Sequence, residues 1–218
     1  CDYTGRPGIA ASYLIREGDQ LAVVETNTNA AVPTILEAVA AQGLAPEDVC
    51  YVVITHIHLD HAGGAGLLMS KCPNATLLAH PRAAPHAVDP SRIVEGASKV
   101  YGSDIFAALY GEILPVPERR VRIMGDDETL SFGSRTWRFL HTAGHAKHHF
   151  CLFDGSSGAV FTGDSYGIVY PHLQRGGMLT FPSTSPTDFD ADAAHASIDR
   201  IAETGARWVF PTHFGRHG

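Results

Sequence analysis

The chain lacks features that would place it in a specialised structural class. No stretch is long and apolar enough to span a membrane, and no signal peptide is visible. The cysteines have no paired-motif spacing, so nothing indicates a disulfide framework. They are Cys1, Cys50, Cys72 and Cys151. We therefore predict no membrane association and a cytoplasmic location.

Positive charge is also scarce. The sequence has 16 Lys and Arg against 23 Asp and Glu, a formal net charge of −7 with His neutral. This balance argues against nucleic acid as a partner. The basic cluster at 119–122 is typical of a solvated strand edge rather than a phosphate-binding track. We expect a small-molecule substrate as the partner, and the sequence does not indicate an oligomeric state.

The remaining composition is that of a globular protein. Of the 218 residues, 44% are hydrophobic and 18% are charged. This length suits one sizeable core and is short for two ordinary domains. We predict a single domain over residues 1–218. Because the sequence begins with a cysteine rather than methionine and stops just after a motif, we expect truncation at either end of it.

Histidine, by contrast, is abundant, with 13 residues that bunch near 56–61 and 141–149. Residues 55–64 follow the apolar run 50–54 and read Thr-His-Ile-His-Leu-Asp-His-Ala-Gly-Gly. Four residues with metal-ligating side chains in six positions are hard to explain as chance polar residues at a strand end. Imidazole and carboxylate groups in such a cluster suit zinc, iron or manganese.

The pattern of apolar residues and turns predicts a mixed α and β chain. We predict strands at 9–15, 21–25, 50–54, 75–79, 112–116, 120–123, 128–132, 136–141, 148–153, 158–162 and 208–210. We predict helices at 33–42, from 62, at 91–110 and at 188–204, and loop at 171–187. The proline-interrupted segment 81–111 is typical of a cap that borders a substrate cleft. Strands and helices thus occur in two successive sets, the order expected of two sheets packed face to face with helices outside.

Three further motifs place polar side chains directly after predicted strands. They are His-Thr-Ala-Gly-His at 141–145, Phe-Thr-Gly-Asp at 161–164 and Thr-His-Phe-Gly at 212–215. The histidine loop at 55–61 has the same position relative to its own strand. Strand ends that converge from distant parts of the chain are a common way to build a site on a rigid scaffold.

These four motifs, in this order, resemble those of the metallo-β-lactamase-fold superfamily, and the resemblance covers nearly the whole chain. It implies an α+β fold, a four-layer αβ/βα sandwich, with two divalent metal ions at one edge, zinc in the first place and iron or manganese as alternatives. By this resemblance the first ion would be bound by His56, His58 and His145. The second would be bound by Asp60, His61 and His213. Asp164 would bridge the two ions, and Asp60 would also orient the attacking hydroxide in catalysis.

The sequence departs from the usual pattern at three positions. Glu25 stands where the family usually has an Asp that supports the metal loop, so we expect Glu25 to do the same with a different reach. Ala143 replaces a proline, which is a mild change. Asp164 stands where the best-known β-lactamases carry cysteine, which favours the glyoxalase-II-like, lactonase-like and phosphodiesterase-like branches over antibiotic hydrolysis.

Residues outside the motifs are harder to assign. Tyr166, Tyr170 and His172 follow Asp164 on a loop, where they could line the substrate cleft or simply pack. For the pair His148 and His149 we consider both a hydrogen bond to a ligand and a polar strand edge. His141 is expected to shape its turn. For the histidines without a motif the expectation is the surface: His80, His86, His195 and His217.

The resemblance implies a metal-dependent hydrolase in which a metal-bridging hydroxide attacks a carboxylic ester, thioester or lactone. Phosphodiester cleavage is a weaker alternative because the chain is acidic and short. A second alternative is a redox protein with two irons that handles oxygen or nitric oxide, or a sulfur dioxygenase. The diiron relatives commonly have Glu where this sequence has His58. A non-catalytic binding module would not need the full set of ligands.

Overall fold

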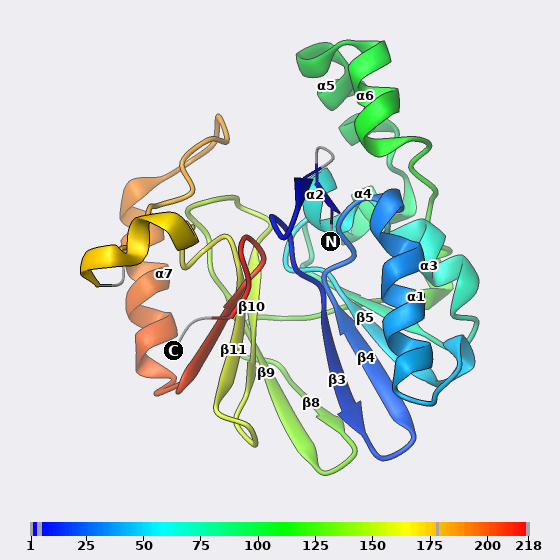
Figure 1. The fold of residues 1–218 in the computed structure, drawn as a ribbon, viewed down its shortest axis with the longest axis horizontal. Coiled ribbons are helices and arrows are strands. Elements are labelled where there is room, and N and C mark those ends of the chain that lie inside the picture. The colour runs from blue at the N-terminus through cyan, green and yellow to red at the C-terminus, as the bar shows by residue number, and fades with distance from the viewer. Residues whose placement is uncertain (1, 4–5, 178, 217–218) are drawn as a thin grey trace.

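The computed structural model describes residues 2–3, 6–177 and 179–216. Two five-stranded sheets pack face to face (Figure 1). The first has the order β3-β4-β5-β6-β7, with β3 antiparallel to β4 and the other neighbours parallel. Its strands are β3 (Tyr13–Glu17), β4 (Gln20–Val24), β5 (Val49–Val53), β6 (Thr76–Ala79) and β7 (Val121–Ile123).

The second sheet has the order β12-β11-β10-β9-β8. Neighbouring strands in this sheet are antiparallel, except that β11 and β12 run parallel. The strands are β8 (Thr129–Phe132), β9 (Arg135–His141), β10 (Phe150–Asp154), β11 (Ala159–Gly163) and β12 (Trp208–Pro211). A short hairpin precedes both sheets, and it consists of β1 (Asp2–Tyr3) and β2 (Arg6–Pro7).

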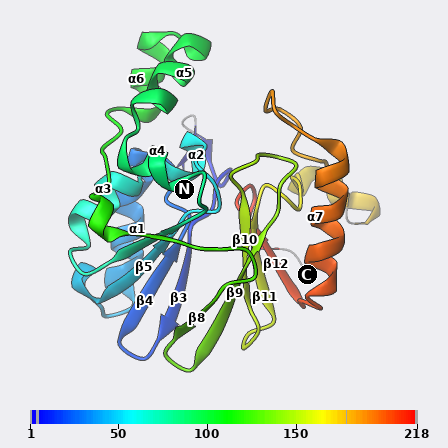
Figure 2. The ribbon, with the colours of Figure 1, turned by 180° about the vertical axis from the view of Figure 1, so that it is seen from behind.

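Helices cover the outer face of each sheet. The α-helices are α1 (Val32–Ala41), α2 (Leu59–Ala62), α3 (Ala65–Lys71), α4 (Ala84–Val88), α5 (Ser91–Tyr101), α6 (Ser103–Tyr110) and α7 (Ala191–Glu203). The 3-10 helices are η1 (Asn29–Ala31), η2 (Pro46–Asp48), η3 (Glu118–Arg120) and η4 (Pro171–Gly176). Helices α1 and α3 lie outside the first sheet and α7 outside the second, as Figure 2 shows from behind. The predicted αβ/βα sandwich is confirmed.

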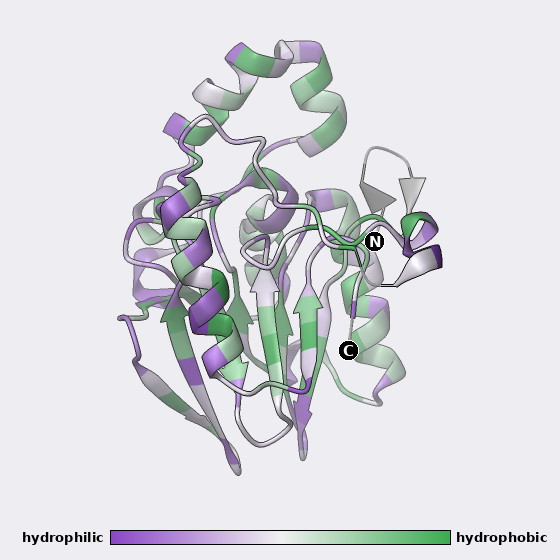
Figure 3. Ribbon diagram, turned by 90° about the vertical axis from the view of Figure 1, so that its left-hand side faces the viewer, coloured by the Kyte–Doolittle hydropathy of each residue, from purple (hydrophilic) through white to green (hydrophobic). Residues whose placement is uncertain are grey.

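Alternation along the strands divides the core into layers. In β4, Leu21 and Val23 face the helices on the outside, whereas Ala22 and Val24 face the second sheet. This is the two-residue period of a pleated strand that is buried on both faces. The layer between the sheets is rich in aromatic residues, and α7 closes the second sheet with Ile201. Figure 3 shows hydrophobic residues along the strands and, alternating with hydrophilic residues, on the helices.

One edge of the sandwich collects the ends of the strands that carry the motifs. β4, β5, β9, β11 and β12 all end at the upper edge in Figure 1. The pair α5–α6 stands out from the body on the same side. It is attached through Phe106 and Tyr110, which pack against Leu59 of the histidine loop. That the segment 81–111, which contains this pair, borders a substrate cleft stays a prediction.

Two predicted strands were wrong in whole or in part. Residues 112–116 form no strand because they pack as an extended connection against α3. The carbonyl of Leu114 lies so close to Gly66 that an added Cβ there would be 1.9 Å from it, and Val116 N donates to Ala87 O at 2.8 Å. The first predicted strand begins later, at Tyr13, and residues 9–12 contact the end of the chain through Ala11 N and Thr212 O.

The basic cluster at 119–122 was predicted to be a solvated strand edge, and this prediction is only partly correct. Arg120 is half-buried and donates to three backbone carbonyls around the end of α3, those of Met69, Cys72 and Ala75. A guanidinium with several donors suits the unpaired carbonyls at a helix C-terminus. Arg119 and Arg122 are exposed, as expected.

Within residues 2–3, 6–177 and 179–216, no helix combines the length and apolar character that crossing a bilayer requires.

Candidate metal centre

The histidine loop is positioned by the segment that follows β4. Glu25 and Asn27 adopt the left-handed conformation, with φ of 66° and 53°. This turn lets Thr26 N and Oγ1 both donate to His61 O at 2.9 Å. Gly64 N donates to Asn27 O at 2.8 Å, and a Cβ on Gly64 would be 2.9 Å from Thr26 O. The glycines after the loop therefore serve close packing, as the sequence indicated.

The side chain of Glu25 is hydrogen-bonded to both ends of the histidine loop, at Thr55 and His61. Its side chain is buried, and Oε1 accepts a hydrogen bond from Thr55 N at 2.7 Å. Oε2 pairs with His61 Nδ1 and accepts from Thr212 Oγ1 at 3.1 Å. A carboxylate that accepts from Nδ1–H leaves the Nε2 lone pair of the imidazole free for a metal ion. The prediction that Glu25 supports the loop is confirmed.

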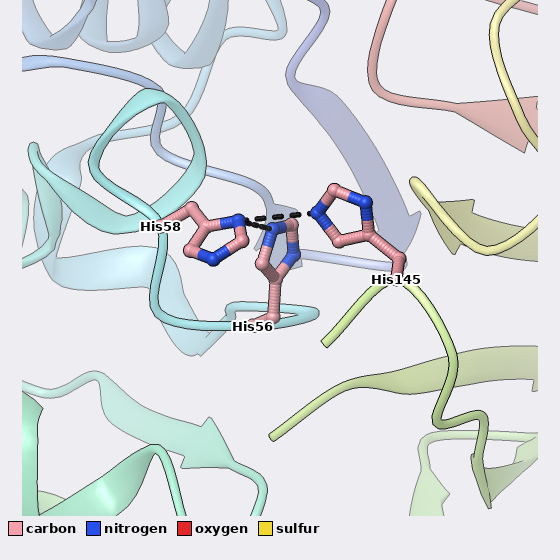
Figure 4. Close-up of side chains that lie close together, drawn as sticks. All are labelled: His56, His58 and His145. Atoms are coloured by element: carbon pink, nitrogen blue, oxygen red, sulfur yellow. Dashed lines mark hydrogen bonds between the residues drawn. The ribbon is translucent and has the colours of Figure 1, made fainter. Parts of the chain in front are cut away.

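Three histidines converge at the first part of the site. His58 Nδ1 lies 2.9 Å from His56 Nε2 and 3.1 Å from His145 Nε2 (Figure 4). Burial lowers the pKa of His58 to about 3, with His145 and His148 adding to the effect. Burial likewise holds the pKa of His56 well below its usual value. Three neutral imidazoles that point at one another place three lone pairs around one point.

Partners on the far side of two of these rings fix which nitrogen points inward. His145 Nδ1 donates to the carbonyl of Ser183 at 2.9 Å, so the neutral ring presents Nε2 without a proton. His56 Nδ1 is 3.0 Å from Thr55 Oγ1. Second partners of this kind orient metal-ligating histidines in known sites.

A second group lies beside the first. His213 Nε2 is 3.4 Å from Asp60 Oδ2, and His61 Nε2 is 3.7 Å from the same oxygen. Burial lowers the pKa of His61, but the carboxylates of Asp164, Asp60 and Glu25 outweigh it and hold this pKa well above the usual value. Burial raises the pKa of Asp60, yet His61 and His213 bring it down to about 2.

Asp164 lies between the two groups. Its Oδ1 is 3.4 Å from His61 Nε2 and 3.6 Å from His213 Nε2, whereas its Oδ2 is 3.4 Å from His145 Nε2. Burial acts to raise the pKa of this carboxyl, but His61, His213 and His145 together hold it well below the usual value. One carboxylate thus presents one oxygen to each group.

The donor set fits divalent metal ions. His61 Nε2 and Asp164 Oδ1 are buried without a hydrogen-bond partner although they face each other. Buried polar atoms are rarely left unpaired, and a cation between them would satisfy both. Within the described residues, three groups bring their ligand atoms within 4.8 Å of one another and could hold a metal ion. They are His56, His58 and His145; His56, His61 and Asp164; and Asp60, His61 and His213.

The predicted cleft residues have different surroundings. Tyr166 lines a cavity together with His145 and Asp164. Tyr170 packs among aromatic rings, with centroids 5.1 Å from Phe214, 5.7 Å from Phe181 and 6.0 Å from His172. His172 is exposed. Their role toward a substrate stays a prediction.

Sequence reasoning left the role of His149 open, and its surroundings are now defined. The side chain is buried; Nε2 accepts from Asp164 N at 3.2 Å, and the ring stacks on that of His56 at 4.8 Å between centroids. Nδ1 lies 2.9 Å from Thr142 Oγ1 and 3.0 Å from Ser165 Oγ. The sequence held one signal for this burial. His149 lies two residues before Cys151, which was expected to be buried, and side chains two apart in an extended segment face the same side.

The surface expectation was wrong for His80. Its side chain is only 6% exposed, and its ring centroid is 4.2 Å from that of His141 in the opposite sheet. His80 directly follows β6, so the second sheet covers it. His86 is half-buried and His195 is exposed, while His217 lies outside the described residues.

The chain is similar in sequence to proteins of one superfamily. The model of the metallo-beta-lactamase superfamily matches residues 5–213. A metallo-beta-lactamase fold-containing protein of Sulfurisphaera tokodaii is 26% identical over 168 residues, which is 76% of this chain and 60% of that relative. The chain therefore matches less than two thirds of this relative's length. A human acyl-coenzyme A thioesterase is 23% identical, covering 94% of this chain and 73% of that protein.

Solved structures agree on the fold. An archaeal metallo-beta-lactamase superfamily protein from Sulfolobus tokodaii superposes with a TM-score of 0.79 at 23% identity, covering 99% of this chain and 78% of the other. A metallo-beta-lactamase family protein from Thermus thermophilus gives a TM-score of 0.69 at 22% identity, covering 98% and 72%. At these identities the likeness concerns the fold alone.

Proposed function

The chain belongs to the metallo-beta-lactamase superfamily, and we propose that it is a hydrolase of carboxylic esters, thioesters or lactones that works with two divalent metal ions. The observation that carries the proposal is the position of Asp164. Its two oxygens face different groups, Oδ1 toward His61 and His213 and Oδ2 toward His145. A carboxylate in this position suits a bridge between two ions.

The ligands divide between the two ions. The first ion would be held by the histidines that converge in Figure 4 and the second by the neighbouring group, with Asp164 shared. Zinc is the expected metal, and the donors also suit iron or manganese. When bound, such ions supply a hydroxide nucleophile near neutral pH and polarise the substrate carbonyl.

The protein's own side chains orient this chemistry. Glu25 and the carbonyl of Ser183 fix the rings of His61 and His145. Asp60 is less buried than the histidine beside it, at 22% exposure of its side chain. We assign to Asp60 the acceptance of a hydrogen bond from the attacking water, in addition to metal binding. Hydrolysis then forms a bond from water oxygen to the acyl carbon, breaks the C–O or C–S bond, and leaves a carboxylate and an alcohol or thiol.

Several findings support an acyl substrate. Relatives carry the names of acyl-coenzyme A thioesterase, hydroxyacylglutathione hydrolase-like protein and acyl carrier protein thioesterase. The net charge of −7 disfavours a nucleic-acid phosphodiester. His58, rather than glutamate, stands in the first group, which disfavours the diiron redox alternative.

Metal analysis and a substrate screen on the same sample test the proposal. Purified protein loaded with zinc should contain two ions per chain and hydrolyse members of a panel of esters, thioesters and lactones. Elemental analysis and the visible spectrum distinguish zinc from iron. A protein that binds two ions but turns over only phosphodiesters, or only consumes oxygen, would overturn the proposed reaction.

The substitution Asp164→Asn tests the bridge. The amide removes the charge shared by the two groups, so bound metal and hydrolysis should fall together, by about 100-fold or more in activity. Asp19→Asn, in the exposed turn between β3 and β4, is the matched control and should change neither. Two retained ions with full activity in Asp164→Asn would contradict the bridging assignment.

A further inference from the structure

A cavity of about 520 Å³ adjoins the candidate metal centre. Its walls come from the turn after β11, from residues 180–184 and from the first turns of α7. His145 and Asp164 belong to these walls, so the cavity and the metal centre share two residues. A substrate whose reacting carbon sits at the metal centre would place an adjoining group here.

The cavity is mostly apolar. Its surface includes Phe189, Ala191, Ala194 and Ile198 from the α7 side and Pro182 from the facing segment. No Lys or Arg is among the described residues that line it. A phosphate or carboxylate group would therefore find no Lys or Arg partner here. A hydrocarbon chain would find the apolar surface typical of ligand pockets.

The cavity wall is tied directly to the candidate metal ligands. Ser183 accepts from His145 Nδ1 through its carbonyl at 2.9 Å, and its hydroxyl donates to Asp164 Oδ2 at 3.1 Å. On the other side, Asp190 N donates to Gly144 O at 2.9 Å, just before α7 begins. The cavity therefore has a defined position relative to the site of reaction.

We propose that this cavity binds the acyl chain of the substrate, which narrows the substrate class to esters and thioesters of hydrophobic, medium- to long-chain acids. This inference rests on the proposed hydrolase function. An apolar cavity of about 150 Å³ holds one benzene molecule, so this one has room for roughly ten or more carbons. His195 and Ile198 are exposed, so the cavity opens to solvent along α7 and longer chains can extend outward.

A chain-length series tests the proposal directly. Zinc-loaded protein is assayed with nitrophenyl esters and acyl thioesters from acetyl to hexadecanoyl. Each methylene group that enters the cavity should raise kcat/KM by about fourfold. The rise should level off once the chain reaches solvent. A kcat/KM that is independent of chain length, or that falls as the chain grows, would overturn the acyl-chain inference.

Two alanines of the same helix provide a matched pair of variants. Ala191 lines the cavity, whereas Ala196 is an exposed residue of α7 away from it. Ala191→Phe should lower the ratio of dodecanoyl to acetyl kcat/KM by at least tenfold, and Ala196→Phe should leave that ratio unchanged. Ile198→Asp, which introduces a charge at a partly exposed position, should lower the same ratio. A ratio of dodecanoyl to acetyl kcat/KM equal to that of the wild-type protein in all three variants would refute the inference.

A binding measurement separates this inference from the hydrolase proposal. Calorimetric titration with dodecanoate should show binding to the wild-type protein and at least tenfold weaker binding to Ala191→Phe. Binding with this dependence but no turnover of any ester, thioester or lactone would refute the proposed reaction and support the cavity's role. Turnover of acetyl esters without dodecanoate binding would refute the cavity's role and support the reaction.

Discussion

Replacing Glu25 by Gln tests how the second group of ligands is held. The amide has one acceptor and one donor where the carboxylate has two acceptors. With its oxygen toward Thr55 N, its NH₂ group faces His61 Nδ1 and Thr212 Oγ1. His61 must then carry its proton on Nε2, where it points at Asp164 Oδ1. The lone pair that a metal ion needs is lost.

The expected loss is confined to one of the two ions. Substitution of a residue that orients a ligand typically weakens metal binding by 10–100-fold, equivalent to about 1.4–2.7 kcal/mol. Glu25 has no hydrogen bond to the histidines of the first group among those described. We therefore expect one tightly bound ion to remain and the second to weaken by that factor.

Competition with a chromophoric chelator, combined with elemental analysis, measures both affinities. At low free zinc, hydrolysis by Glu25→Gln should fall by the same factor as the second affinity, and added zinc should restore it. Glu37→Gln, on the exposed face of α1, should behave as wild type. Two equally tight ions in Glu25→Gln, or loss of the first ion instead of the second, would refute this account of Glu25.

Two further pairs of variants test packing. Gly163→Ala should cost roughly 3 kcal/mol or more of unfolding free energy, because φ is +49° and the new Cβ would lie 2.4 Å from Thr55 Oγ1. Gly18→Ala, at φ +60° with open space around it, should cost only about 1–2 kcal/mol; equal losses in urea denaturation would contradict the steric argument. Arg120→Met should cost about 1–3 kcal/mol by leaving carbonyls at the end of α3 unpaired. The exposed Arg119→Met should change stability by less than about 0.5 kcal/mol, and similar values for both would show that the carbonyl contacts contribute nothing.

Much of the architecture was predictable because its signals are local. Apolar runs followed by turns marked nearly all of the strands, and the order of strands and helices indicated two covered sheets. The motif at 55–61 was informative by itself because its ligand-type residues lie within one loop. His145, Asp164 and His213 were assigned only through the order of motifs, since no local pattern states that three strand ends meet.

The errors share a physical cause, which is contact with a distant segment. Residues 112–116 (Glu-Ile-Leu-Pro-Val) are mostly apolar, as in a buried strand. Their backbone instead contacts α3 and α4 rather than a neighbouring strand. His80 resembles an ordinary polar residue after a strand, yet the ring of His141 from the other sheet covers it. The role of His149, which the sequence left open, depends on distant contacts in the same way, because Asp164 N, Thr142 and Ser165 surround its ring. None of these contacts follows from residues near in sequence.

The convergence of strand ends from both sheets has a consequence for folding. The loop after β5, in the first sheet, contributes His56, His58, Asp60 and His61, and the second sheet contributes His145, Asp164 and His213. Neither half of the chain holds a complete set of ligands for both proposed ions. Metal ions bound there would cross-link the two halves of the chain at one edge, as a disulfide does. Unlike a disulfide, this cross-link would depend on the concentration of free metal. The concentration of free metal would then affect the free energy of unfolding as well as the rate of the proposed hydrolysis.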